Sequence, residues 1–130
     1  MRSRLASMPI IEVSAVIFRD SRGRILQVRK RGTTAFQFPG GKPEAHEKPA
    51  DAAVREVAEE LTVYLDRRDL VPLGARTAPA SNEPDYTVLA HLFEYPRPII
   101  AQPAAEIVEL AWVDHANPHV PLAPLSAAFR

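Results

Sequence analysis

The chain has 130 residues, of which 46% are hydrophobic and 25% charged, enough apolar material for one globular domain. The 16 basic and 16 acidic residues give a formal net charge of zero, so no broad basic surface points to polymeric nucleic acid or to an anionic membrane. There is no cysteine, which excludes disulfides, thiolate catalysis and cysteine-ligated zinc and is consistent with a cytoplasmic protein. No apolar run approaches the ~18 residues that a membrane span requires.

The first part of the chain is expected to contain a flexible lead-in and then short strands. We assign residues 1–8 to the lead-in and residues 9–130 to a single domain. The β-branched, apolar stretch 10–18 predicts a strand, and a polar turn with glycine follows it. The alternating stretch 24–30 is expected to be the antiparallel partner of this strand, and residues 35–38 are a candidate third strand.

A helix is expected over residues 49–61, after a loop rich in proline and glycine. Pro49 suits the first turn, where its missing N–H costs nothing. Apolar residues recur at helical spacing and form a stripe that would face a core: Ala50, Ala53, Val54, Val57, Ala58 and Leu61. Glu56, Glu59 and Glu60 lie at i, i+3 and i+4, so they share one edge of this helix.

The second half of the chain contains further strand patterns. Strands are expected over residues 69–77, 85–95 and 107–113, and a short last helix from about Leu122. The 13 prolines lie mostly between these elements, so they punctuate one domain and do not mark a disordered linker.

Glycine and charged residues in the middle of the chain follow a fixed spacing. Gly41 is followed by five residues, Glu47, seven residues and then the stretch REVAEELTV, residues 55–63. This pattern resembles the Nudix box, which reads Gly, five residues, Glu, seven residues, Arg-Glu-aliphatic-any-Glu-Glu-any-Gly-aliphatic. The preceding FQFPGGK and the later LAWV are similar to MutT-like members, so the resemblance covers roughly residues 10–125. It implies an α/β fold, the Nudix fold, in which a mixed central β-sheet is sandwiched between helices.

The chemistry of pyrophosphate cleavage explains why these residue types occur together. Breaking the linkage concentrates negative charge on phosphoryl oxygens, which a divalent cation can offset. Mg²⁺ prefers hard oxygen ligands, and carboxylates at i, i+3 and i+4 can converge on such an ion. The resemblance therefore implies a magnesium cofactor, with Mn²⁺ as a substitute.

The resemblance also implies roles for individual residues. The metal ligands would be the Gly40 carbonyl, Glu56, Glu59 and Glu60, with Glu47 as a secondary ligand. The catalytic set would be Glu59, Glu56, Arg55 and Lys42. Within it, Arg55 would orient a catalytic carboxylate by a charge-assisted hydrogen bond, and Lys42 would approach the phosphate chain. Phe36 is a candidate for stacking on the base, and the general base stays open between Glu59, Glu106 and Glu109.

Simpler interpretations exist for several of these residues. The helix glutamates suit a solvated face, where an Arg55–Glu59 pair would be worth ~0.3–0.5 kcal/mol. The register of Gly41 and Glu47 with that helix favours the metal site instead. Phe36, Phe38 and Trp112 also suit a core, and the four histidines lack a metal-ligand spacing.

Thr62 departs from the family pattern, because it stands where the box has glycine. Glycine at a helix C-terminus usually adopts a left-handed conformation. A β-branched residue in that conformation would cost ~1 kcal/mol or more. Since the metal ligands all precede Thr62, we expect an unusual helix exit and no loss of chemistry.

The substrate class follows from the resemblance less directly. The compact length and the FPGGK lead-in favour a MutT-like nucleoside triphosphate pyrophosphohydrolase, with oxidised nucleotides among its candidates. Pro124 stands where MutT-like proteins that recognise oxidised guanine tend to carry an asparagine. Its presence argues against selectivity for guanine nucleotides. Pro79 lies where ADP-ribose hydrolases often have proline, so ADP-ribose or another nucleoside diphosphate sugar is the alternative. A non-catalytic nucleotide-binding module is a third hypothesis, which the retained glutamates oppose. The expected partner is a small nucleotide, with no polymeric nucleic acid and no membrane, and the protein is expected to be a monomer or a homodimer.

Overall fold

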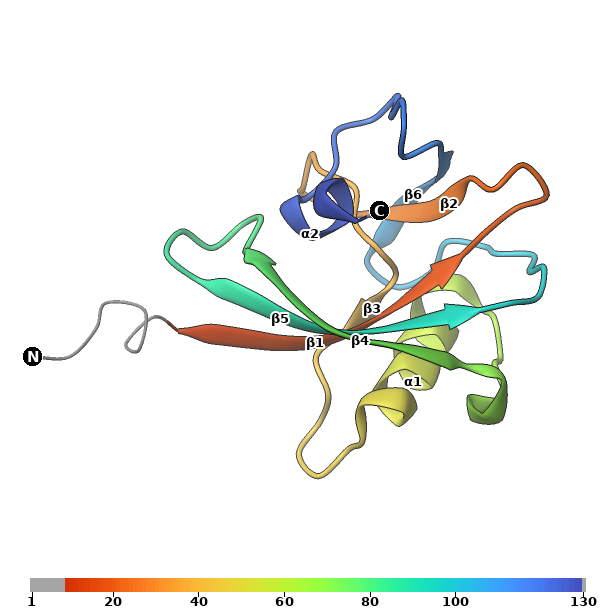
Figure 1. Cartoon of the computed structure of the whole chain (residues 1–130), viewed down its shortest axis with the longest axis horizontal. Coiled ribbons are helices and arrows are strands. Elements are labelled where there is room, and N and C mark those ends of the chain that lie inside the picture. Colours follow the sequence, from red (N-terminus) through yellow and green to blue (C-terminus); the bar gives the residue numbers. More distant parts are fainter. Residues whose placement is uncertain (1–8, 130) are drawn as a thin grey trace, which may run out of the picture.

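The computed structural model describes residues 9–129 and contains a four-stranded mixed sheet (Figure 1). The order of its strands is β3 (Gly40–Gly41), β1 (Ile10–Phe18), β5 (Thr87–Tyr95) and β4 (Val71–Pro79). β1 runs parallel to β5 along its whole length, and the other two pairs are antiparallel. The lead-in predicted for residues 1–8 lies outside the described residues.

β1 is the centre of the fold because its two faces pack against different layers. Val16 and Phe18 belong to the core cluster that includes α1 (Pro49–Leu61). Ala15 and Ile17 point to the opposite face and pack in a second cluster with Phe129, which follows α2 (Pro124–Ala128). Helices therefore lie on both faces of a mixed sheet, and the predicted α/β sandwich is confirmed.

The predicted pairing of β2 (Ile25–Lys30) with β1 is wrong. β2 forms a separate two-stranded antiparallel sheet with β6 (Ile107–Val113), and only an isolated bridge, Arg19 to Ile25, connects it to the end of β1. The reason is that both edges of β1 are already taken, one by β5 and the other by β3 and the Pro39 carbonyl. Strand periodicity predicts which face a residue occupies but not which neighbour a strand pairs with.

The third strand lies a few residues later than predicted. Phe36 and Gln37 make isolated bridges, to Leu122 and to Val28, and the regular pairing with β1 is made by Gly40 and Gly41. The glycines therefore lie directly against the backbone of β1, which brings the loop before α1 to the edge of the sheet beside β1.

The remaining elements agree closely with the sequence pattern. α1 spans Pro49–Leu61 and β6 spans Ile107–Val113, as predicted. β4 and β5 begin two residues later than expected, and α2 begins at Pro124. A short 3₁₀ helix, η2 (Arg67–Asp69), connects α1 to β4. Among the described residues no helix has the length and apolarity needed to span a membrane.

Thr62 ends α1 in the conformation that glycine normally supplies. Its φ and ψ are 58° and 37°, in the left-handed region, and its N–H donates to the Ala58 carbonyl at 3.2 Å. The expectation of an unusual helix exit is therefore wrong. The helix ends in the ordinary way, with Thr62 in a left-handed conformation that is strained for a β-branched residue. Tertiary packing of α1 outweighs the local preference of one residue.

We expect Thr62→Gly to stabilise the protein by about 1 kcal/mol, because glycine adopts this conformation without a steric cost. The gain will be partly offset by the greater conformational freedom of glycine in the unfolded chain. Urea unfolding of the two proteins measures the difference. A destabilised variant would mean that the Thr62 side chain makes a favourable contact that exceeds its backbone strain.

Candidate functional site

Arg55 connects α1 to the preceding loop. Its guanidinium donates two hydrogen bonds to Glu47, from Nε to Oε2 and from Nη2 to Oε1, both at 2.9 Å. A third donor, Nη1, reaches Glu56 Oε1 at 2.9 Å, and Nη2 also donates to the Lys42 carbonyl at 3.1 Å. This arrangement uses the fork of arginine donors in the way that bidentate carboxylate recognition requires.

The electrostatics of this network follow from its hydrogen bonds. The Arg55 guanidinium, with help from the Glu44 N–H, lowers the pKa of the Glu47 carboxyl to about 2. The hydrogen bond to Glu47 also raises the pKa of Arg55 above its usual value. Both groups are therefore fully charged at neutral pH, and the loop is tied to the helix by charge.

Glu59 is the least engaged of the three helix glutamates. Its side chain is 54% exposed, and its contact with Arg55 Nη1 spans 3.5 Å. A hydrogen bond of that length is weak, so the Glu59 carboxylate can change its position at little cost.

Glu60 lies in the opposite situation, because it is buried with an exposed fraction of 2%. The Gly40 N–H donates to its Oε1 at 2.9 Å, while its Oε2 is buried without a hydrogen-bond partner. Burial raises the pKa of Glu60 to about 8, although the Gly40 hydrogen bond and the positive charge of Lys30 oppose the shift. A buried carboxylate oxygen without a partner is costly unless a cation or a proton satisfies it.

The two glycines allow this close approach. A Cβ on Gly40 would lie 2.0 Å from the Ser14 carbonyl oxygen, and one on Gly41 would lie 2.4 Å from Cδ of Glu56. A side chain at Gly40 would clash with backbone, whereas one at Gly41 would require the Glu56 side chain to move. The Gly40 N–H, and not its carbonyl, faces Glu60, so the predicted role of the carbonyl as a metal ligand stays a prediction.

The carboxylates do not form a preformed metal cluster. Within residues 9–129, no three Asp, Glu or His side chains are grouped in a way that could hold a metal ion. Arg55 holds Glu47 and Glu56, while Glu60 faces Gly40. The hard carboxylate oxygens and the unpaired Glu60 Oε2 nevertheless suit Mg²⁺ or Mn²⁺. Binding a cation at Glu56 would require its carboxylate to exchange part of its contact with Arg55.

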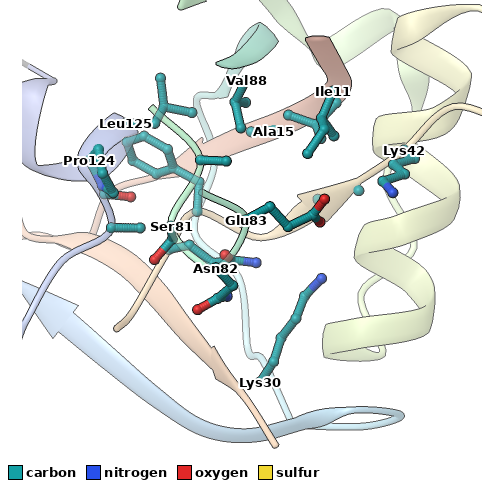
Figure 2. Close-up of a pocket in the computed structure, with 18 of the residues that line it drawn as sticks. Ile11, Ala15, Lys30, Lys42, Ser81, Asn82, Glu83, Val88, Pro124 and Leu125 are labelled. Carbon is teal, nitrogen blue, oxygen red and sulfur yellow. The ribbon is translucent and has the colours of Figure 1, made fainter. Parts of the chain in front are cut away.

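A cleft of about 380 Å³ opens beside these residues (Figure 2). Figure 2 shows Lys42 next to α1, and Glu56 of that helix and the two glycines also line the cleft. Pro124 and Leu125 line it on the side of α2, and further apolar lining residues are Ile11, Val13, Phe38 and Val88. Polar residues of the loop between β4 and β5 also line it: Ser81, Asn82 and Glu83.

Phe36 does not line this cleft, although its sequence context makes it a candidate for stacking on a base. Its side chain is 4% exposed, and its backbone pairs with the segment before α2. Phe38, two residues later, is the aromatic residue that lines the cleft, and it also packs edge-to-face on Phe129 at 5.5 Å between ring centroids. The sequence FQF could not indicate which of the two rings faces the cavity, since they share a face of the strand.

The two candidate bases near the C-terminus differ in position. Glu106 lines the cleft and forms an ion pair with Lys30 at 3.2 Å. Glu109 pairs with Arg29 at 2.8 Å and is not among the residues that line the cleft. Only Glu106 is therefore placed where it could contact a ligand.

Comparison with known protein families matches the NUDIX domain over residues 8–128. The chain belongs to the Nudix family. An RNA pyrophosphohydrolase from Halorhodospira halophila (strain DSM 244 / SL1) is 43% identical over 60 residues, which are 46% of this chain and 32% of that protein. The match therefore spans less than a third of that relative's length.

Solved structures of Nudix proteins show the same fold. The crystal structure of a MutT NUDIX hydrolase from Burkholderia pseudomallei has a TM-score of 0.75 at 18% identity, over 91% of this chain and 93% of that one. A bifunctional NMN adenylyltransferase/ADP ribose pyrophosphatase from Francisella tularensis, complexed with AMP and an Mn ion, has a TM-score of 0.60 at 19% identity, over 82% of this chain and 34% of that one. At these identities the similarity establishes the fold alone.

Several cleft residues of this Nudix protein were missed from the sequence. Lys30 and Phe38 lie in strand patterns, where charge and aromaticity are common for structural reasons. Asn82 and Glu83 lie in a segment that the sequence marks only as a loop. Ser126, 1% exposed with a buried and unpartnered Oγ, lies in α2 and gives no signal in the sequence.

Proposed function

We propose that this Nudix protein is a magnesium-dependent pyrophosphohydrolase that cleaves nucleoside triphosphates to a nucleoside monophosphate and pyrophosphate. The observation that carries the proposal is the buried Glu60 carboxylate, whose Oε2 has no partner beside Gly40. A group of this kind supports a cation site next to the cleft. The family match supports the reaction class.

The charge of the cleft supports the need for a cation. Two lysines, Lys30 and Lys42, line it together with three glutamates, Glu56, Glu83 and Glu106, so 2 − 3 leaves one net negative charge. A polyphosphate would be repelled by this lining unless additional positive charge entered with it. Divalent cations are the usual means by which proteins bind such substrates.

The protein's own residues have distinct tasks in this proposal. When bound, the cation supplies charge neutralisation and lowers the pKa of a water molecule. Arg55 holds Glu56 and the loop at Glu47 in register with α1. Glu59, exposed and weakly held, is the helix carboxylate that is free to accept the proton of the attacking water. Lys42 lies at the cleft and balances phosphate charge.

The shape of the cleft favours a single nucleotide. Its volume of about 380 Å³ suits one small ligand, and its apolar and charged lining residues would contact a base and a phosphate chain respectively. Pro79 also lines the cleft, which keeps ADP-ribose as the second candidate. The relative named as an RNA pyrophosphohydrolase adds a 5′-triphosphorylated oligonucleotide to the compounds that need testing.

A substrate panel with and without Mg²⁺ tests this function. It contains the four common nucleoside triphosphates, their oxidised forms, ADP-ribose and a 5′-triphosphorylated oligonucleotide, with pyrophosphate and phosphate release as the readout. We expect magnesium-dependent release of pyrophosphate from at least one triphosphate. If no compound turns over, and Glu59→Gln binds nucleotides as well as the wild type, the protein is a binding module and the proposal fails.

The Arg55 network provides a further prediction. We expect Arg55→Lys to lower kcat by about tenfold or more, because lysine cannot hold Glu47 and Glu56 in a bidentate geometry. Because lysine retains the positive charge, a lower kcat would reflect the lost geometry of the hydrogen bonds and not a lost charge. Steady-state kinetics on the best compound of the panel measures the effect. Unchanged kinetics would show that the network braces the loop without positioning the reacting groups.

A further inference from the structure

Lys30 stands at the end of a strand face that packs on the helix of the site. Side chains alternate along β2, so Lys30 shares a face with Leu26 and Val28. These two residues belong to the same core cluster as Val57 of α1. The opposite face carries Arg29. Lys30 therefore continues a row of side chains that runs toward α1.

The pairing with β6 changes its register at this point. Arg29 is opposite Glu109, whereas Lys30 is opposite Ile107, so β6 carries one extra residue. Such a bulge bends a strand and alters the direction of neighbouring side chains. The two adjacent cations of β2 have different surroundings: Arg29 pairs with Glu109 outside the cleft, whereas Lys30 pairs with Glu106 and lines the cleft.

Lys30 approaches the site from β2, a different part of the chain from the one that carries Lys42. Figure 2 shows its side chain extending from β2 into the cavity, while Lys42 lies next to α1. Its ammonium group lies 3.2 Å from Glu106 Oε1. An ammonium group has three N–H donors, so pairing with Glu106 leaves donors for a ligand.

We propose that Lys30 binds the phosphate chain of the nucleotide, and that Glu106 is the positioning residue that holds Lys30 in the cleft. The identity of the ligand rests on the proposed function. Lys30 and Lys42 would then both contact the chain, and the positive charge of Lys30 would offset phosphate charge that the cation does not reach. Glu106, paired with this ammonium group, is not the general base.

Binding of non-hydrolysable ligands in Mg²⁺ tests the role of Lys30. The probes are α,β-imido triphosphates of the four common nucleosides and α,β-methylene ADP-ribose, and calorimetry gives Kd. We expect Lys30→Gln to raise Kd by about tenfold or more, as the loss of a charged hydrogen bond does. Lys30→Arg keeps the charge and should stay within about threefold of the wild type. Arg29→Gln, the adjacent cation outside the cleft, is the matched control and should leave Kd unchanged.

The role of Glu106 is tested by a double-mutant cycle. We expect Glu106→Gln alone to raise Kd by about threefold, and to have no further effect when Lys30 is already glutamine. Its kcat on the best substrate should stay within about twofold of the wild type. A loss of kcat of about a hundredfold with unchanged Kd would instead identify Glu106 as a base and overturn its positioning role.

Failure of this inference can be distinguished from failure of the proposed function. If the wild type turns over no substrate, the proposed enzymatic activity is refuted. The binding measurements still determine how much Lys30 contributes to the affinity for the probes. If Lys30→Gln binds every probe as tightly as the wild type, or if the wild type binds none of them, the assignment of Lys30 is wrong.

Discussion

Glu60→Gln is expected to lower kcat by at least ~100-fold, the loss that removal of a metal ligand commonly causes. The substitution keeps the size of the side chain and its hydrogen bond from the Gly40 N–H. It replaces the buried, unpartnered Oε2 with an uncharged group. Steady-state kinetics on the best substrate of the panel measures the loss. Turnover like that of the wild type would refute the assignment of Glu60 to the cation site.

The stability of the same variant separates lost chemistry from lost folding. Burial raises the pKa of Glu60 to about 8, well above the usual value of a glutamate, so the metal-free folded protein binds this proton more tightly than the unfolded chain does. The wild type in a chelator should therefore lose stability as the pH rises through this window, whereas Glu60→Gln should not. Urea unfolding at pH 4 and at pH 9 makes the comparison, and we expect the variant to be the more stable protein at pH 9. Equal pH dependence in both proteins would show that Glu60 is not buried as described.

Gly40→Ala is expected to destabilise the fold by about 3 kcal/mol or more, because the new methyl group has no space. Its Cβ would lie 2.0 Å from the Ser14 carbonyl oxygen and 2.8 Å from Cα of Ala15, and both are backbone atoms of β1. The φ of 148° adds strain for any residue with a side chain. Relief of the clash would move β3 away from β1 and break the contact between the Gly40 N–H and Glu60.

Gly23→Ala is the matched control for this substitution. Gly23 also has a positive φ, of 77°, but a Cβ there would have no neighbour within 4 Å. Its replacement should cost only about 1 kcal/mol, the price of a left-handed conformation. Urea unfolding of both variants gives the difference. If the two losses of stability were equal, the close contact between β3 and β1 would not be what excludes a side chain at Gly40. If Gly40→Ala yields no folded protein while Gly23→Ala does, the prediction is confirmed in its stronger form.

The sequence predicted the positions of the charged residues along α1 better than it predicted the tertiary contacts around them. Pro49 and the apolar stripe specify α1 residue by residue, so the relative positions of Arg55, Glu56 and Glu60 follow from helix geometry. The burial of Glu60 does not follow, because it depends on a long-range contact with Gly40. Local patterns encode neighbours along a helix, and they carry no information about an amide twenty positions away.

Strand pairing and the cleft were the least predictable features. β2 was expected beside β1, yet the Gly40–Gly41 segment occupies that edge and β2 pairs with β6. The cleft is therefore lined from β2 as well as from α1, and Lys30 becomes one of its residues. Thr62 illustrates the reverse case, since a correct local rule was overridden by the packing of a whole helix.

The hydrogen bond from the Gly40 N–H to Glu60 has a practical consequence for spectroscopy. An amide that donates to an ionisable carboxylate changes its chemical shift when that carboxylate gains or loses a proton, or when a cation arrives. The chain contains five glycines, so a sample labelled with ¹⁵N only at glycine gives a spectrum of at most five peaks. One of these peaks would follow the charge of Glu60 directly, and titration with Mg²⁺ would report cation binding without any substrate.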